Sequence, residues 1–283
     1  MTTHTLDSAP ESRQARMPSA GSAGPLRFVG ILRSEAIKLR SLRSTVWSYA
    51  VLVLVSVGLA VLLAATLASA PDEQLPADAQ TAVVMQVIAF PIGFAQLVAA
   101  VLGVLFIAGE YGTGMVRSTF TAVPRRLSVL WAKSVVLFAA TFVVGLIATV
   151  GGYLASAPFL ARSGIIAPLG DPDVVRAAVG GALYLALIAV FSLGIGTMVR
   201  NSAGGIAIVL GIILILPTVL QVIPTDWAAN LVPYVISDAG LGALGLQSDV
   251  PGALEPWQQL LIVLGWVAAS LAAGATLMKR RDA

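Results

Sequence analysis

The chain has 283 residues, of which 58% are hydrophobic and 11% are charged, with a net charge of +3. Soluble domains carry about 25% charged and about 45–50% apolar residues, so this chain could not cover itself with polar surface in water. Cysteine is absent and His4 is the single histidine, in a polar segment. Disulfides, thiolate metal sites and cysteine nucleophiles are therefore excluded, as is a histidine metal site or general base inside a membrane. The composition predicts an integral membrane protein with no catalytic residue and no metal site.

The first 25 residues are rich in Ser, Ala, Pro and charged residues and contain no apolar run. This composition predicts a disordered cytoplasmic tail over residues 1–25. No apolar core follows its arginines, so the segment is not expected to be a signal peptide.

A basic amphipathic helix is predicted from Leu26 to about Thr45. At 100° per residue its apolar side chains fall on one side and most of its Lys and Arg side chains on the flanks or opposite, which is typical of a helix in the membrane interface. The apolar side is formed by Phe28, Val29, Ile31, Leu32, Ala36, Leu39 and Leu42. Glu35 also falls in this sector, where a carboxylate needs a basic partner, a route to water or contact with protein. We expect Glu35 to reach water or to pair with a nearby Lys or Arg.

Six apolar runs follow this helix, each about 18–26 residues long, which is enough to cross a hydrocarbon core of about 30 Å at 1.5 Å per residue. The predicted spans are Val46–Ala68, Val83–Ala108, Val129–Tyr153, Ala177–Met198, Ile206–Ile223 and Leu260–Leu277. The expected fold is therefore an all-α integral membrane domain of six transmembrane helices over residues 26–283.

The basic residues predict the orientation. If the amino terminus is cytoplasmic, every Lys and Arg except Arg162 and Arg176 falls in a cytoplasmic segment, while most acidic residues fall in the external loops. This bias is the positive-inside signal. It predicts a multi-pass protein of the cell membrane with both termini in the cytoplasm.

The predicted spans contain few polar groups. No Asp, Glu, Lys or Arg falls well inside any run, whereas carriers driven by protons or sodium ions usually need intramembrane carboxylates, so energy for pumping would have to enter elsewhere. Gln86 and Gln96 flank Pro91, which is expected to kink the second span. These three residues either line a pathway or pack between helices. Pro217 interrupts the fifth run, and the glycine-rich stretch Gly194–Gly211 would let helices approach closely.

The segment between the second and third runs is the longest predicted cytoplasmic loop. Gly112 and Gly114 allow a tight turn, Met115–Phe120 could form a short helix, and Pro124 would stop it. Basic donors follow at Arg117, Arg125 and Arg126. Such a segment is either an ordinary positively charged loop or a stiff coupler that docks on a cytosolic partner and passes a displacement to the helices it joins.

Three segments resemble the ABC-2 family of transporter permeases. Ser34–Ser44 resembles that family's amino-terminal interfacial helix, and Gly109–Arg126 with Lys133 resembles its coupling region. Gly194–Gly204 is similar to the family's turn between its fourth and fifth helices. In addition, Trp227–Leu246 looks like the short re-entrant helices that the family places before its last span.

The resemblance implies a permease subunit of an ATP-driven ABC transporter that exports a lipophilic or drug-like substrate. It implies two protein partners, a cytosolic ABC ATPase subunit and a second permease subunit in a homodimer or heterodimer, within the lipid bilayer and without nucleic acid. Contact with the ATPase would involve Glu110, Gly112, Thr113, Arg117, Pro124, Arg125 and Arg126. The interfacial helix would use Glu35, Lys38, Arg40 and Arg43. A substrate path near the second and fifth helices would involve Gln86, Pro91 and Gln96.

The chain has no P-loop, Gly-x-x-x-x-Gly-Lys-Ser/Thr, because none of its lysines, Lys38, Lys133 and Lys279, follows a glycine. ATP and magnesium would therefore be bound by the partner ATPase, and this chain is expected to be neither an enzyme nor a cofactor-binding protein. One alternative is an energy-independent channel or facilitator, which would work without a partner. Another is a membrane enzyme or an assembly protein, although Ser192 or Ser270 as a nucleophile would have no evident base.

Overall fold

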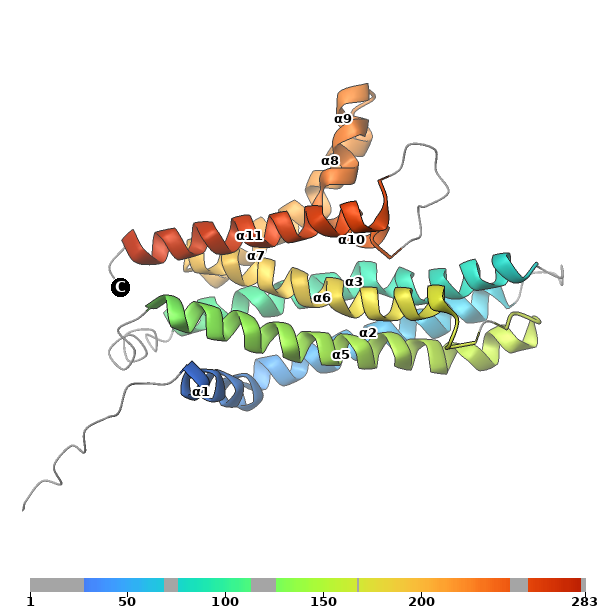
Figure 1. The fold of residues 1–283 in the computed structure, drawn as a ribbon, viewed down its shortest axis with the longest axis horizontal. Coiled ribbons are helices and arrows are strands. Elements are labelled where there is room, and N and C mark those ends of the chain that lie inside the picture. The colour runs from blue at the N-terminus through green and yellow to red at the C-terminus, as the bar shows by residue number, and fades with distance from the viewer. Residues whose placement is uncertain (1–27, 69–75, 113–125, 167, 245–253, 281–283) are drawn as a thin grey trace, which may run out of the picture.

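The computed structural model describes residues 28–68, 76–112, 126–166, 168–244 and 254–280. Over these residues the structure is built from helices and contains no β-strand (Figure 1). Six helical segments have the length and apolar composition needed to cross a membrane, which confirms the predicted number of spans. They indicate a multi-pass membrane protein. The predicted tail, residues 1–25, lies outside the described residues.

The observed spans are centred on the predicted runs and most extend beyond them. They are α2 (Arg43–Leu67), α3 (Ala77–Gly112), α5 (Arg126–Arg162), α6 (Pro172–Val199), the segment Ser202–Val222, and α11 (Pro256–Arg280). The difference arises because apolar composition marks only the part of a helix suited to the hydrocarbon core, whereas polar residues at a helix end continue the helix toward water.

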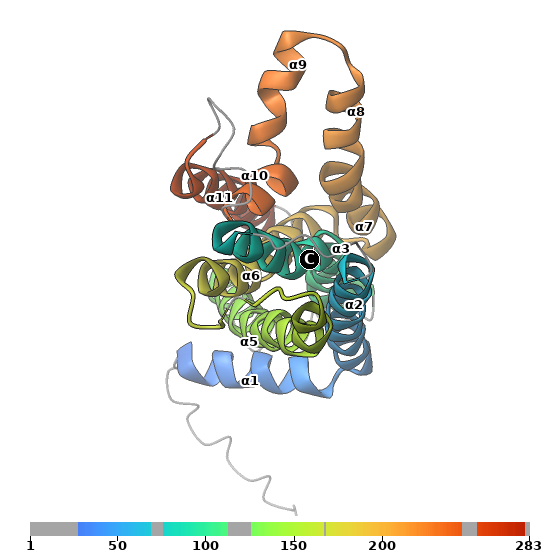
Figure 2. The same ribbon diagram turned by 90° about the vertical axis from the view of Figure 1, so that its right-hand side faces the viewer.

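The predicted amphipathic helix is α1 (Phe28–Ser41), and the chain passes through Leu42 directly into α2. Figure 2 shows α1 lying beneath α5, perpendicular to the spans, which are seen end-on, and Figure 1 shows that it lies near one end of the bundle. We call this end the α1 end; the carboxyl end of α11 lies there too (Figure 1). The buried side of α1 carries Ile31, Glu35 and Leu39, and Ile31 packs against Val129 of α5.

The centre of the bundle is α6, which packs against α3, α5 and α11. Glycines let these helices touch through their backbones: a Cβ at Gly103 of α3 would overlap the carbonyl oxygen of Ala189, and one at Gly194 would lie 2.6 Å from the Ser270 hydroxyl of α11. Such small residues are typical of helix interfaces in membranes. The expected close approach is confirmed at Gly194, whereas a Cβ at Gly211 would meet no atom within 4 Å.

The fifth span is interrupted. After α7 (Ser202–Leu210) comes a π-helical turn, η1 (Gly211–Ile215), and then α8 (Leu216–Val222), which has Pro217 in its first turn. Proline lacks an N–H, and its ring clashes with the preceding turn of a regular α-helix. The wider π-helical turn before Pro217 makes room for the ring. The α7 helix packs against α3 and α6, while α8 projects sideways from the bundle (Figures 1 and 2).

Short helices precede the last span, as the family resemblance implies. They are α9 (Asp226–Leu231), the 3₁₀ turn η2 (Val232–Tyr234) and α10 (Ile236–Gly242). The Trp266 indole N–H of α11 donates a hydrogen bond of 2.9 Å to the Tyr234 carbonyl oxygen. A Cβ at Gly240 would overlap the ring of Tyr184, so α10 packs directly onto α6. These contacts hold α10 against the bundle.

Asp238 of α10 provides a pH-dependent test of this packing. Burial raises the pKa of its carboxyl group above 3.8, and hydrogen bonds from Ser237 and from its own backbone oppose the shift. Since the folded pKa exceeds the unfolded value of about 3.9, the folded protein binds more protons, and the free energy of unfolding falls as pH rises from that value through the folded pKa. We expect Asp238→Asn to raise the unfolding temperature at pH 7 by about 1–3 °C, the shift for a change below about 1 kcal/mol.

The measurement is thermal unfolding in detergent, followed by tryptophan fluorescence, between pH 3.5 and pH 7. The difference between Asp238→Asn and the unsubstituted protein should disappear at the acid end of this range. Glu255→Gln is the matched control, because Glu255 is exposed. A lower unfolding temperature for Asp238→Asn at pH 7 would contradict the prediction.

Candidate functional site

Four charged side chains from three helices meet at the α1 end. Lys133 Nζ of α5 donates hydrogen bonds to Glu35 Oε2 of α1 at 2.6 Å and to Glu110 Oε1 of α3 at 2.9 Å. Lys38 Nζ of α1 donates to Glu35 Oε1 at 2.8 Å and to Glu110 Oε1 at 3.1 Å. Each carboxylate therefore contacts both ammonium groups. We call these four residues the ion cluster.

Most of the ion cluster is buried: Lys133 is 0% exposed, Glu35 1% and Glu110 6%. Lys133 Nζ also donates to the Phe106 carbonyl oxygen at 3.3 Å and lies 4.0 Å from the centre of the Phe106 ring. Its three N–H donors thus have three acceptors. An ammonium group buried without such partners would cost several kcal/mol, so the cluster is stable only when α1, α3 and α5 are together.

Lys38 forms the outer edge of the cluster, with its side chain 22% exposed. Burial by itself lowers the pKa of Lys38, but the hydrogen bonds and charges of Glu35 and Glu110 outweigh this effect and raise the pKa above 10.5. The stabilisation from Lys38 is therefore fully present below about pH 10.4 and is lost only as pH rises through the folded pKa. Lys38 stays protonated at physiological pH.

The turn between α6 and α7 lies against the same end of α3. The guanidinium carbon of Arg200 is 5.3 Å from the centre of the Tyr111 ring. Arg200 ends α6 in the left-handed region, with φ of 56°, and its N–H donates to the Gly196 carbonyl oxygen at 3.0 Å. Asn201 then caps α7 by accepting a hydrogen bond of 2.9 Å from the Gly204 N–H. A two-residue turn therefore sits beside the carboxyl end of α3.

The predicted coupling residues flank this site. Glu110 is in the ion cluster, Gly112 is the last residue of α3, and Arg126 is the first residue of α5. Thr113, Arg117, Pro124 and Arg125 lie outside the described residues, as does the short helix expected at Met115–Phe120. The described ends of α3 and α5 are joined by the Glu110–Lys133 pair, so the predicted coupling segment begins and ends on helices that are fixed to each other.

The predicted interfacial-helix residues divide into two groups. Glu35 and Lys38 face the bundle and belong to the ion cluster, which gives Glu35 the basic partner that its position requires. Arg40 and Arg43 are exposed.

The predicted pathway residues of α3 do not share one environment. Gln86 is exposed, whereas Pro91 and Gln96 are buried. The Gln96 Oε1 atom accepts a hydrogen bond from the Tyr184 hydroxyl of α6, and its Nε2 donates to the Gly93 carbonyl oxygen at 2.9 Å. Gln96 therefore joins α3 to α6, as polar groups between membrane helices commonly do.

Lys133 is the member of the ion cluster whose role is missed in the sequence. Lys133 is the fifth residue of the third predicted span, so the sequence assigns its charge to the cytoplasmic side of the membrane. The structure instead buries Lys133 completely within α5. Lys133 lies near the start of the span, as expected, but its complete burial is not predicted from the sequence. The sequence does contain a signal for the Glu35–Lys133 pair. Lys133 lies among apolar residues and Glu35 in the apolar sector of its helix, so each of these opposite charges needs a partner.

No protein-family model and no curated protein matches this chain. The segments that carry the ABC-2 resemblance meet at the α1 end: Glu35 and Lys38 come from the first, Glu110, Tyr111 and Lys133 from the second, and Arg200 from the third. Among the described residues, no group of three or more His, Asp or Glu is placed to hold a metal ion. The arrangement can fix α1 and the facing ends of α3 and α5 relative to one another.

Proposed function

We propose that this chain is the membrane-spanning permease subunit of an ATP-driven ABC transporter. It exports a lipophilic or drug-like substrate and is energised by a separate cytosolic ATPase, which binds ATP and magnesium. A second permease subunit completes the transporter. The observation that carries the proposal is the ion cluster, because it joins α1 to the two helix ends that flank residues 113–125.

The ion cluster suits the transmission of a displacement. Lys133 lies seven residues after the start of α5, about 10 Å along the helix, and Glu110 lies two residues before the end of α3. Because these residues are paired at 2.9 Å, a force on the intervening segment would not spread the two helices apart. It would move them as one unit together with α1. A cytosolic partner docked on residues 113–125 would thereby act on the membrane part of the protein.

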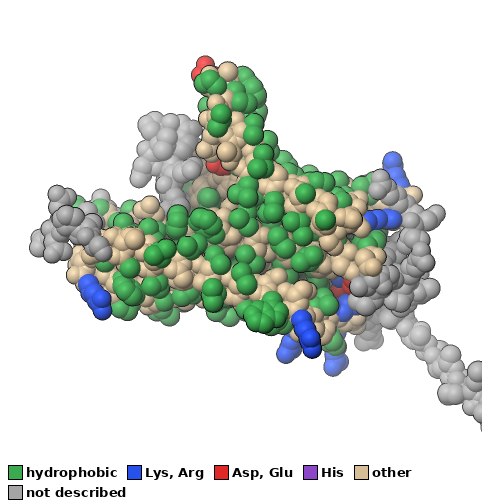
Figure 3. Space-filling model, turned by 180° about the vertical axis from the view of Figure 1, so that it is seen from behind, with side chains coloured by type: hydrophobic (Ala, Val, Ile, Leu, Met, Phe, Trp, Pro, Cys, Tyr) green, Lys and Arg blue, Asp and Glu red, His purple; other side chains and the backbone are tan. Residues whose placement is uncertain are grey.

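The surface charge supports placing the α1 end in the cytoplasm. Lys and Arg side chains gather at this end, whereas few lie at the opposite end (Figure 3). Arg162 closes α5 and Arg176 lies in the first turns of α6, both away from the α1 end. The positive-inside bias then supports two cytoplasmic termini in the cell membrane. The exposed Arg33 and Arg40 of α1, which lies across the bundle, support a location at the membrane surface.

Co-purification tests the proposal. The tagged protein is isolated from its host in mild detergent and the proteins bound to it are identified. We expect an ATPase with a P-loop, and we expect Arg125→Glu with Arg126→Glu to remove it, because two repulsive charges replace two attractive ones at the docking segment. Lys279→Glu with Arg280→Glu is the control, since it makes the same charge change elsewhere on the α1 end and should keep the ATPase.

A folded protein without an ATPase, obtained under conditions that preserve a known ABC complex, would overturn the proposal. Passive flux through liposomes that contain the purified chain alone would then favour the channel or facilitator.

A further inference from the structure

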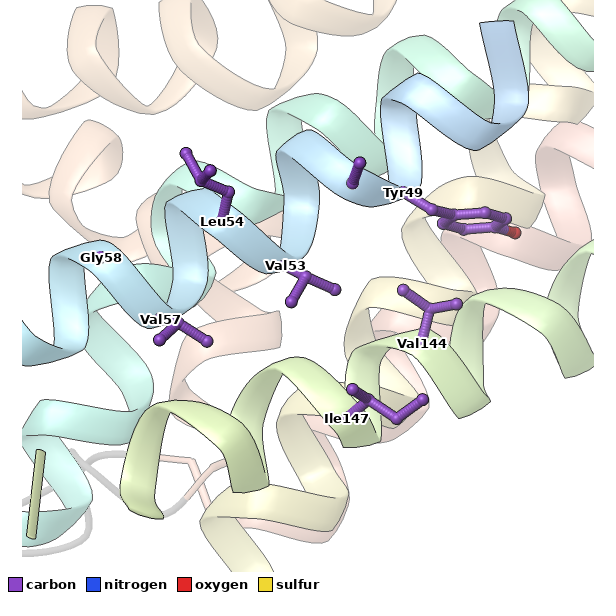
Figure 4. Close-up of a pocket in the computed structure, with 8 residues that line it drawn as sticks. Tyr49, Val53, Leu54, Val57, Gly58, Val144 and Ile147 are labelled. Atoms are coloured by element: carbon purple, nitrogen blue, oxygen red, sulfur yellow. The ribbon is translucent and has the colours of Figure 1, made fainter. Parts of the chain in front are cut away.

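A groove runs along the outer surface of the bundle between α2 and α5, with a volume of about 740 Å³ (Figure 4). Its walls are residues of α2 between Tyr49 and Gly58, and Val144 and Ile147 of α5. The lining is almost entirely apolar, and the volume falls in the range of about 300–1,000 Å³ that is usual for small-molecule sites. We call it the α2–α5 groove.

Packing between α2 and α5 fixes the position of the α2–α5 groove. At one end the hydroxyls of Tyr49 and Thr141 form a hydrogen bond of 2.9 Å between the helices. At the other end α2 and α5 touch closely, because a Cβ at Gly152 would lie 3.2 Å from the Ala60 Cβ. Gly58 faces outward beside this contact: a Cβ there would meet no atom within 4 Å, whereas Val57 lies against Gly151 and Gly152 of α5. The groove therefore lies on the outer face of a packed α2–α5 interface.

The length of the groove matches one leaflet of a bilayer. From Tyr49 to Gly58 the helix advances about 14 Å at 1.5 Å per residue. Half of a hydrocarbon core of about 30 Å is about 15 Å. The groove begins six residues after Arg43, the first residue of α2, and ends nine residues before Leu67, the last, so its centre lies nearer the α1 end of the span.

A basic group stands at the α1 end of the groove. Arg43 precedes Ala50 by seven residues and Val57 by fourteen, and this heptad spacing places all three along one face of α2. Arg43 is exposed, and Trp47, 71% exposed, lies one turn further along. Tryptophan is typical of the headgroup level, and a guanidinium group binds phosphate through two parallel hydrogen bonds. An exposed guanidinium group thus lies on the same face of α2 as the groove, six residues before its first lining residue.

We propose that the α2–α5 groove binds one acyl chain of an anionic phospholipid from the leaflet at the α1 end, with the lipid phosphate held by Arg43. The lipid fills the space between α2 and α5 and stabilises their packing. This proposal does not depend on transporter function, because the groove lies on the outer surface of the bundle whatever the protein moves.

The test uses the full chain, reconstituted in nanodiscs of equal parts phosphatidylcholine and phosphatidylglycerol. The protein is then extracted into mild detergent, and the retained lipid is counted by native mass spectrometry. We expect the unsubstituted protein to retain phosphatidylglycerol in preference to phosphatidylcholine. Arg43→Gln should abolish this preference, while Arg33→Gln, a control at an exposed arginine of α1, should keep it.

Gly58→Leu tests the acyl-chain site, since the new side chain enters the groove without meeting protein atoms at its Cβ. We expect retained phosphatidylglycerol to fall at least about tenfold, because each displaced methylene weakens binding about fourfold. Gly265→Leu on α11 is the control: its Cβ likewise meets no atom within 4 Å, and lipid retention should not change.

Unchanged phosphatidylglycerol retention in Gly58→Leu, with both leucine variants folded by size-exclusion chromatography, would overturn the proposal. An unchanged preference in Arg43→Gln would overturn the assignment of the phosphate to Arg43. Retention of an uncharged lipophilic compound instead of phospholipid, in protein purified directly from the host, would show that the groove holds a different class of ligand.

Discussion

Lys133→Met is expected to lower the free energy of unfolding by about 3–5 kcal/mol, the usual cost of removing one partner from a buried ion pair. The substitution leaves Glu35 and Glu110 buried with Lys38 as their remaining basic partner in the cluster. Methionine keeps the length of the apolar stem and its contact with the Phe106 ring, so the loss reports the charge rather than a cavity. The measurement is the fraction of folded protein in detergent, by size-exclusion chromatography and thermal unfolding.

A double substitution separates charge imbalance from general damage. Glu35→Gln combined with Lys133→Met leaves Lys38 paired with Glu110 at 3.1 Å, which restores equal numbers of positive and negative charges. We expect the double variant to be more stable than Lys133→Met alone, giving a large coupling energy in a double-mutant cycle. Additive losses from the two single substitutions would mean that Glu35 and Lys133 do not interact in the folded protein.

Gly103→Ala is expected to give the second large effect, a loss of about 1–3 kcal/mol or more from overpacking at the α3–α6 interface. The new Cβ would overlap the Ala189 carbonyl oxygen and lie 2.9 Å from the Ser192 Cβ. Neither atom can move without shifting the backbone of α6, which is buried at the centre of the bundle. The helices would therefore have to separate.

Gly93→Ala is the matched control on the same helix. A Cβ there meets no atom within 4 Å, so the higher helix propensity of alanine should stabilise the protein by about 0.5–1 kcal/mol. Thermal unfolding of the two variants in the same detergent gives the comparison. Equal unfolding temperatures would show that α3 and α6 do not approach as closely as described.

The number of spans follows from the sequence because the hydrocarbon core demands long apolar helices, whichever helix is considered. The arrangement of those spans does not follow. In their most apolar windows α2 has a mean hydropathy of 2.7 and is 22% buried, whereas α6 has 2.2 and is 83% buried. Because lipid and protein interior are both apolar, hydropathy cannot distinguish a central helix from a lipid-facing one. The glycines of α6, such as Gly194, were the available sign of its central position.

The site could be predicted in part. The position of Glu35 on the apolar side of α1 showed that it needed a partner, since helical periodicity is a local property. Its partner Lys133 is 98 residues away, and no local pattern encodes such a pairing. Pro217 likewise predicted an interruption of the fifth span. The π-helical turn and the sideways direction of α8 depend on tertiary contacts, which cannot be predicted from the local sequence. The role of residues 113–125 stays a prediction.

The separation of Glu35 and Lys133 along the chain also determines the order in which the members of the ion cluster are synthesised. At about 5–20 residues per second, the ribosome makes Lys133 about 5–20 s after Glu35, and both α2 and α3 are synthesised in that interval. Glu35 can remain at the membrane surface, where water solvates its charge. Glu35 and Glu110 are thus already synthesised before Lys133. Until α5 is made, Lys38 is the basic partner in the cluster for both acids, and α5 completes the ion cluster.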